Sequence, residues 1–297
     1  MTGAFGYTGK YITRRLLALG KKVITLTGRP GRPNPFGAQV RAFPFNFDRP
    51  AELAETLRGA ATLYNTYWVR FPRGETTYER AVENTLLLLR AAEEAGVRRI
   101  VHISITNAAE DSPLPYFRGK GMLEKAIRNS RLTYVIIRPT VIFGVEDILI
   151  NNIAWLLRKF PVFAVPGAGD YRLQPVFVED VAELAVEAAH KEENMVIEAV
   201  GPEVYTFNEL VRLIARQVRS RARIIHLPPP AVLWLGKFIS YLVKDVVITP
   251  DEIAGLAAGL LISKNPPAGR TLFSQWLDRH AGSLGTAYAS ELSRHYR

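Results

Sequence analysis

The sequence predicts an α/β protein built on a doubly wound parallel sheet, and two observations carry this prediction. Gly3, Gly6 and Gly9 recur every three residues and lead into an amphipathic run over 10–19, the pattern of a tight turn that opens a helix. Apolar β-branched segments then alternate with helical segments as far as residue 104. Such alternation produces right-handed βαβ units with helices on both faces of a parallel sheet, as in a Rossmann-like fold.

The first strand of this sheet is missing from the N-terminus. A glycine turn of this kind follows a strand, normally the central one, yet only Met1 and Thr2 precede Gly3. We therefore interpret Met1 as a mis-assigned start, for example a GTG codon that encodes an internal valine. If the chain begins at Met1, we expect the loss of the central strand to lower stability.

The remaining elements follow from local signals. The β-branched or aromatic composition of four segments predicts strands over 22–29, 40–47, 61–67 and 97–104. Helical periodicity predicts helices over 48–57 and 77–95, the first with an aspartate cap, and another that opens at Pro115. The segments 176–189 and 195–200 return to the sheet.

The domain organisation is discontinuous. We predict a dinucleotide-binding domain over 1–147, with 174–200 returning to it, and a smaller substrate region formed by 148–173 and 201–250. The segment 251–297 is a C-terminal helical tail. A capping box from Thr206 to Glu209 starts a helix in the substrate region. Candidates for substrate contact there are Asn151, Asn152, Tyr171 and Arg172.

The glycine turn is suited to holding phosphate. Glycines permit a tight turn and close backbone approach, and a helix N-terminus offers N–H groups and a positive dipole to a pyrophosphate. The candidate cofactor-binding residues of this turn are Gly3, Phe5, Gly6, Tyr7, Thr8 and Gly9. Where an NAD-binding unit carries an acid, about 20 residues past the turn, this chain has Arg29. A guanidinium suits a 2′-phosphate, so we predict NADP(H) rather than NAD(H); a solvated loop arginine is the alternative.

Tyr116 and Lys120 lie four residues apart at the start of a predicted helix and so share one of its faces. A free tyrosine has a pKa of about 10, which is too high for a base at neutral pH. A nearby ammonium favours the phenolate and lowers that pKa, so the pair is suited to acid–base work. The spacing also arises by chance. Gly119 and Gly121 flank the lysine and weaken the helix, which indicates either close packing on a cofactor or a relaxed catalytic constraint.

Several motifs occur together in a characteristic order over residues 2–200. They are Thr2-Gly-x-x-Gly-x-x-Gly9, Ser104-Ile-Thr106, Tyr116-x-x-x-Lys120, the run Arg138 to Gly144 and the run Gln174 to Ala182. Together they resemble the extended and atypical short-chain dehydrogenase/reductase superfamily, nearest the branch that contains the nucleotide-binding accessory subunit of respiratory complex I.

The resemblance implies roles for individual residues. It implies that Tyr116 is the catalytic acid/base, that Lys120 binds the nicotinamide ribose and tunes Tyr116, and that Thr106 hydrogen-bonds the reacting carbonyl. Asn84 matches the family's asparagine in the helix after the fourth strand, which makes it a fourth candidate catalytic residue. The further cofactor positions are Asn46, which stands where the family has an adenine-contacting aspartate, Phe47 and Pro139, which ends the sixth strand.

Composition excludes several other functions. The chain has no cysteine, and its five histidines show no metal-ligand spacing, so we expect no metal site. The net charge of +10 is spread along the chain without a basic block interleaved with aromatic residues, so we expect no nucleic-acid binding. No signal peptide or run of about 20 apolar residues is present, which predicts a cytoplasmic protein. The apolar segment 231–243 leaves open peripheral contact with a membrane or membrane complex.

These observations predict an NAD(P)-binding oxidoreductase or epimerase that transfers hydride to or from a small-molecule carbonyl or carbinol. The alternative is a non-catalytic protein that keeps NADPH bound, in a structural or sensory role at a membrane complex. The sequence leaves the substrate and the oligomeric state open.

Overall fold

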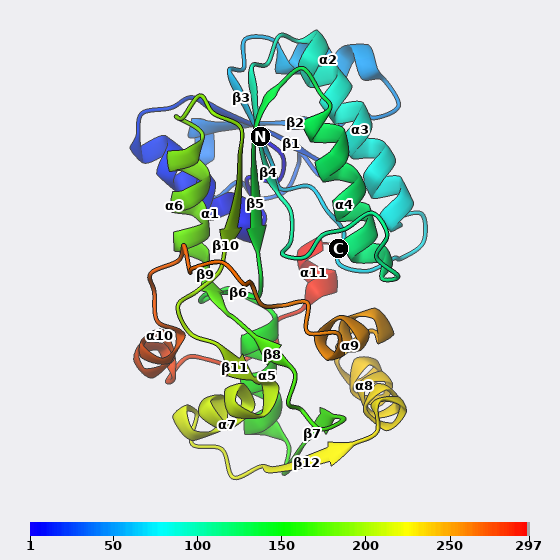
Figure 1. Cartoon of the computed structure of the whole chain (residues 1–297), viewed down its shortest axis with the longest axis vertical. Coiled ribbons are helices and arrows are strands. Elements are labelled where there is room, and N and C mark those ends of the chain that lie inside the picture. The colour runs from blue at the N-terminus through cyan, green and yellow to red at the C-terminus, as the bar shows by residue number, and fades with distance from the viewer. Residues whose placement is uncertain (296–297) are drawn as a thin grey trace. The chain divides into compact units, whose positions relative to one another are not determined.

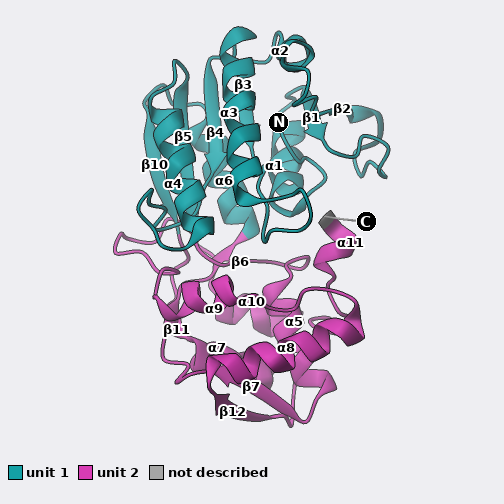
Figure 2. Ribbon diagram, turned by 90° about the vertical axis from the view of Figure 1, so that its right-hand side faces the viewer, with its two compact units in different colours: residues 1–139, 178–199 teal, residues 140–177, 200–297 magenta. Residues whose placement is uncertain are grey.

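The computed structural model describes residues 1–295 and divides the chain into two compact units (Figure 2). Unit 1 comprises Met1–Pro139 and Val178–Ala199, and unit 2 comprises Thr140–Phe177 and Val200–Arg297. The last two residues of the predicted C-terminal tail lie outside the described part of the chain.

Unit 1 is built on parallel strands, as predicted. The strands are β1 (Val23–Thr27), β2 (Val40–Pro44), β3 (Thr62–Asn65), β4 (Arg99–Ile103), β5 (Thr133–Pro139) and β10 (Met195–Ala199). One sheet has the strand order β10-β5-β4-β3, and a second sheet has the order β1-β2. All five residues of β4 are buried, which is typical of a parallel strand covered on both faces.

The first three residues lie between β1 and β3, where the sequence lacked a strand. The Leu26 N–H donates to the Met1 carbonyl (2.8 Å), and the Gly3 N–H donates to the Leu26 carbonyl (3.0 Å). On the other side, the Thr2 N–H donates to the Tyr64 carbonyl (2.9 Å). Met1–Gly3 therefore links the two sheets through backbone hydrogen bonds, although only Thr2 forms a β-bridge, with Leu26.

Helices cover both faces of the unit 1 strands (Figure 1). On one side α1 (Tyr7–Ala18) packs along α6 (Val178–Ala188), and Arg15 forms a 2.8 Å salt bridge with Glu183 between them. On the other side lie α2 (Pro50–Leu57), α3 (Tyr78–Glu94) and α4 (Pro115–Arg128). The core beneath α2–α4 is aliphatic and includes Leu53, Leu63, Leu88, Ile100 and Ile136. The doubly wound α/β prediction is confirmed.

Unit 2 consists of short strand pairs and helices. Its strands are β6 (Ile142–Phe143), β7 (Val162–Pro166), β8 (Arg172–Leu173), β9 (Val176–Phe177), β11 (Tyr205–Thr206) and β12 (Arg223–Leu227). Its helices are α5 (Leu149–Lys159), α7 (Phe207–Gln217), α8 (Pro229–Val243), α9 (Pro250–Ala257), α10 (Phe273–His280) and α11 (Glu291–His295). Strand β6 pairs with β9, β7 with β12 and β8 with β11.

The interior of unit 2 is aromatic and aliphatic. Phe143 is fully buried and lies 5.0 and 5.1 Å, between ring centroids, from Phe273 and Trp276. The predicted capping box is present, because the Thr206 side chain accepts the Glu209 N–H and the Glu209 carboxylate accepts the Thr206 N–H. Across residues 1–295, no helix combines the length and the apolar character needed to cross a membrane.

Candidate nucleotide-binding and catalytic site

The turn from Gly3 to Gly9 requires glycine at two positions for steric reasons. Gly3 has a φ of +64°, and a Cβ on Gly9 would lie 2.0 Å from the Gly3 carbonyl oxygen. Gly6 is the N-cap of α1 and carries no side chain to cap the first amides of that helix. The backbone therefore forms a close, side-chain-free approach to a helix N-terminus, which is the arrangement that binds a pyrophosphate.

Two arginines follow β1, of which the sequence analysis identified only the first. The Arg29 N–H donates to the Thr27 hydroxyl (3.2 Å), and the Arg32 N–H donates to the Arg29 carbonyl (3.2 Å). Burial and the positive charge of Arg29 lower the pKa of Arg32, so the two guanidinium groups are electrostatically coupled. Both side chains are partly buried. The signal for Arg32 was its position three residues beyond Arg29 in the same loop.

In the loop after β2, the Asn46 side chain forms hydrogen bonds with two residues at the start of α2. Asn46 has a left-handed φ of 47°, its amide donates to Glu52 (3.1 Å), and its amide oxygen accepts from Arg49 (3.0 Å). These bonds hold the start of α2 and engage the side chain that stands at the family's adenine-contacting position. Phe47 stacks on Phe45 with ring centroids 4.8 Å apart.

Tyr116 and Lys120 both lie against Trp68. Pro115 occupies the first turn of α4 and sets the start of the helix, so Tyr116 lies at its beginning. The Tyr116 ring meets Trp68 edge-on at 5.7 Å, and the Lys120 Nζ lies 4.6 Å from the Trp68 ring centroid.

Lys120 is held inside unit 1 by a backbone acceptor. Its side chain is 3% exposed, and its Nζ donates to the Ile103 carbonyl at 2.7 Å. Burial lowers the pKa of Lys120 to about 7, partly opposed by the negative charge of Glu124. The buried ammonium therefore loses its proton close to neutral pH.

Thr106 donates its hydroxyl to Glu198 in a close hydrogen bond. Arg138 bridges this carboxylate, at 3.2 Å from Nη1, to Glu124, at 2.9 Å from Nε. Ser104 also donates to Glu124 (2.6 Å), which is 1% exposed. A charged network therefore lies behind both hydroxyls that follow β4. Glu124 and Glu198 were not predicted; the signal for Glu124 was an acid four residues after Lys120 on the same helix face.

Asn84 and Pro139 make separate contacts. The Asn84 amide on α3 donates to the Tyr67 hydroxyl at 3.0 Å, and burial raises the pKa of Tyr67. The Pro139 carbonyl accepts the Thr106 N–H at 2.9 Å, so it fixes the backbone at Thr106. Thr106, Lys120 and Pro139 are thus brought together by β4, α4 and β5, whereas Asn84 is paired with Tyr67.

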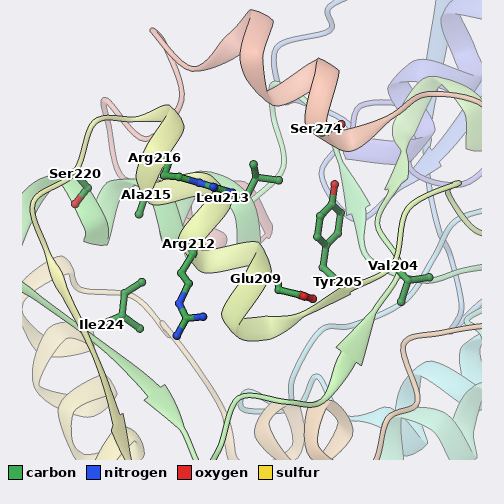
Figure 3. Close-up of a pocket in the computed structure, with 10 residues that line it drawn as sticks. All are labelled: Val204, Tyr205, Glu209, Arg212, Leu213, Ala215, Arg216, Ser220, Ile224 and Ser274. Atoms are coloured by element: carbon green, nitrogen blue, oxygen red, sulfur yellow. The ribbon is translucent and has the colours of Figure 1, made fainter.

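Unit 2 carries a separate open cleft of about 650 Å³ along α7 (Figure 3). It is lined in part by Tyr205, Arg212, Arg216 and Ile224, and it contains none of the predicted substrate residues. Of those, Asn152 is used structurally, since its amide donates to the Ala289 carbonyl and accepts the Ala289 N–H. Among residues 1–295, no cluster of His, Cys, Asp or Glu could hold a metal ion.

Part of the chain matches a known family, and most of the chain is similar to known proteins. Residues 3–148 match the family described as NAD(P)H-binding. The chain is 26% identical over 283 residues to the Arabidopsis thaliana "NADH dehydrogenase [ubiquinone] 1 alpha subcomplex subunit 9, mitochondrial", covering 89% of this chain and 70% of that protein. It is 25% identical over 242 residues to the ceramide reductase of Caulobacter vibrioides, covering 80% and 76% of the two chains.

Solved structures share the fold. A triphenylmethane reductase from Citrobacter sp. superposes with a TM-score of 0.76 at 17% identity, covering 95% of this chain and 98% of that one. The NADPH complex of the quinone oxidoreductase QOR2 from Escherichia coli gives 0.72 at 21% identity, covering 100% and 99%. The resemblance stated from the motifs is therefore confirmed. Residues 3–148 match the NAD(P)H-binding family, and the chain is similar in sequence to proteins named as subunits of the mitochondrial NADH dehydrogenase.

Proposed function

We propose that unit 1 binds NADP(H) in preference to NAD(H). The observation that carries this proposal is the pair Arg29 and Arg32, which interact electrostatically, together with the tight glycine turn that opens α1. Two guanidinium groups suit the dianionic 2′-phosphate that distinguishes NADP from NAD. The turn from Gly3 to Gly9 suits a pyrophosphate, because its tight backbone, which a Cβ at Gly9 would disrupt, leads directly into the N-terminus of α1.

In the catalytic form of this proposal, the protein is a reductase, dehydrogenase or epimerase acting on a carbonyl or carbinol. Bound NADPH would supply the hydride for reduction of a carbonyl, and bound NADP+ would accept it in oxidation of a carbinol. Tyr116 moves the proton at its phenol oxygen, and the ammonium of Lys120 favours the phenolate. Thr106 orients the substrate oxygen. Because its hydroxyl donates to Glu198, a substrate has to take over that hydrogen bond before Thr106 can donate to it.

A second candidate function is nucleotide binding without turnover, at a membrane complex. The observation that favours it is the engagement of Lys120 by the Ile103 carbonyl and of Thr106 by Glu198. The relatives named as subunits of NADH dehydrogenase add support. In this form the protein is cytoplasmic, and its segment 231–243 contacts the membrane or the complex.

Titration of the purified protein with NADPH and NADH, followed by nicotinamide fluorescence, tests the cofactor proposal. We expect tighter binding of NADPH; tighter binding of NADH, or binding of neither by folded protein, would overturn it. A Tyr116→Phe variant with Tyr134→Phe as control then separates the two forms. Loss of carbonyl reduction in Tyr116→Phe alone, with NADPH affinity retained, supports the enzyme. Reduction that is unaffected by the substitution, or absent from the wild type with every carbonyl tested, argues against it.

A further inference from the structure

Helix α8 (Pro229–Val243) is apolar on two opposite faces. Its inner face is buried within unit 2 through Val232 and Gly236. The outer face exposes large side chains at helical spacing: Trp234 (68% exposed), Phe238 (55%), Tyr241 (82%) and Leu242 (54%). A helix that is apolar all round is normally covered all round, so the outer face indicates a binding partner.

The contacts of α8 prevent it from turning this face inward. A Cβ on Gly236 would lie 2.7 Å from Ile248 Cγ2, so the helix is pressed against the segment that follows it. Its end is fixed by the left-handed Lys244 and by the Asp245 N–H, which donates to the Ser240 carbonyl at 3.0 Å. The exposed face is therefore a stable property of unit 2.

The Asp245 carboxylate strengthens this anchorage. It is 5% exposed and accepts the backbone N–H groups of Glu291 (2.7 Å) and Leu292 (3.1 Å). These hydrogen bonds tie the residue that follows Lys244 at the end of α8 to the start of α11. Rolling the helix would break these buried hydrogen bonds, and buried polar groups left without partners are costly.

The chemistry of the outer face favours a lipid surface with negative charge. Trp and Tyr combine an apolar ring with a polar tip and gather at membrane–water interfaces. The charged residues between Pro229 and Lys244 are Lys237 and Lys244, with no acid among them. Lysine stems extend along apolar surface while their ammonium groups reach headgroups. At 15 residues, α8 is too short to span a bilayer but has the length to lie in its interface.

We propose that the outer face of α8 binds the interface of an anionic lipid bilayer, with Trp234, Phe238 and Tyr241 among the acyl-chain boundary and Lys237 at the headgroups. This binding site is independent of the nucleotide site in unit 1. The proposed partner of segment 231–243 is therefore lipid and not a protein subunit.

Sedimentation of the full chain with vesicles tests the proposal. We expect binding to phosphatidylcholine vesicles containing about a quarter phosphatidylglycerol, and binding about tenfold weaker or less to phosphatidylcholine alone. Trp234→Ala combined with Tyr241→Ala reduces binding at least about tenfold, because each removes a large apolar side chain from the interface. Lys237→Gln reduces binding about fivefold, and only to the anionic vesicles.

Val145→Ala is the matched control, since Val145 is 57% exposed in unit 2 and is not part of α8. It should bind vesicles as the wild type does. NADPH titration and thermal melting of each variant show that the fold is retained. A blue shift of tryptophan fluorescence on anionic vesicles should disappear in Trp234→Phe while vesicle binding persists.

Three outcomes overturn the proposal. One is failure of the folded wild type to bind anionic vesicles. Another is equal binding by the wild type and the Trp234/Tyr241 double variant. The third is concentration-dependent dimerisation in the absence of lipid that the double variant abolishes, which would assign the face to a second copy of the chain. Failure to bind NADPH would leave the lipid proposal intact, so the two proposals fail separately.

Discussion

Replacing Arg32 with glutamine should weaken the binding of NADPH and leave that of NADH unchanged. Arg32 follows Arg29 in the loop after β1, and burial, together with the positive charge of Arg29, lowers its pKa. A 2′-phosphate placed between the two guanidinium groups would be attracted by both. NADH lacks this phosphate, so its binding depends on the glycine turn instead.

The size of the effect follows from exposure. A hydrogen bond to a charged group contributes about 1.5–3 kcal/mol. Both arginines are only partly buried, so solvent screening favours the lower end of that range. We therefore expect the Kd for NADPH to rise about tenfold in Arg32→Gln. Higher salt should weaken NADPH binding more in the wild type than in the variant, because the lost interaction is ionic.

Fluorescence titration with both nucleotides measures this prediction directly. Arg90→Gln, which removes an exposed arginine from α3, is the control and should change neither affinity. Melting temperatures should agree between the variants. An unchanged Kd for NADPH in Arg32→Gln would refute the reasoning. An equal loss for NADPH and NADH would place Arg32 on a part that both nucleotides share.

Three further predictions concern the stability of the folded protein. Gly9→Ala should lower NADPH affinity at least about tenfold and destabilise unit 1, because its Cβ would lie 2.0 Å from a backbone oxygen, whereas Gly282→Ala, with nothing within 4 Å, should be neutral in titration and melting. Glu124→Ala should lower the unfolding free energy in urea by about 3 kcal/mol, because it breaks a buried pair with Arg138; a loss below about 1 kcal/mol would contradict this. Burial raises the pKa of Asp147 from 3.8 to about 7, so the folded state retains a proton that the unfolded state releases, and the melting temperature should fall as pH rises between these values. Asp147→Asn should flatten that part of the pH profile.

Local signals allowed the fold of unit 1 to be predicted. The turn at Gly3, the helical period after it and the alternation of apolar strands depend on neighbours in the chain, so they can be read without tertiary information. The bonds of Met1–Gly3 to β1 and β3 could not be read in this way, since they join Thr2 to Tyr64 and Gly3 to Leu26. They show how backbone hydrogen bonding alone continues a sheet across residues too few to be recognised as a strand.

The candidate site was predictable to a smaller extent, because its electrostatics come from residues far apart in the sequence. Thr106 and Glu198 are 92 residues apart, and Arg138 and Glu198 are 60 apart. A motif identifies Thr106 and Lys120 by position. It does not identify the Glu198 carboxylate or the Ile103 carbonyl that accepts their hydrogen bonds. Arg32 could have been identified from the sequence, because it lies three residues beyond Arg29 in the same loop.

The two glycines beside Lys120 show how packing determines the chemistry of this lysine. A Cβ on Gly119 would lie 2.7 Å from the Trp68 ring, and a Cβ on Gly121 would lie 2.4 Å from the backbone of Ala109. Both contacts are made with the protein's own loops, so each glycine is required by packing within the protein. Gly119 lets the indole ring lie against α4, where it meets the Lys120 ammonium at 4.6 Å. Since burial is the main cause of the lowered pKa of Lys120, the small residue before the lysine helps to set its ionisation near neutral pH.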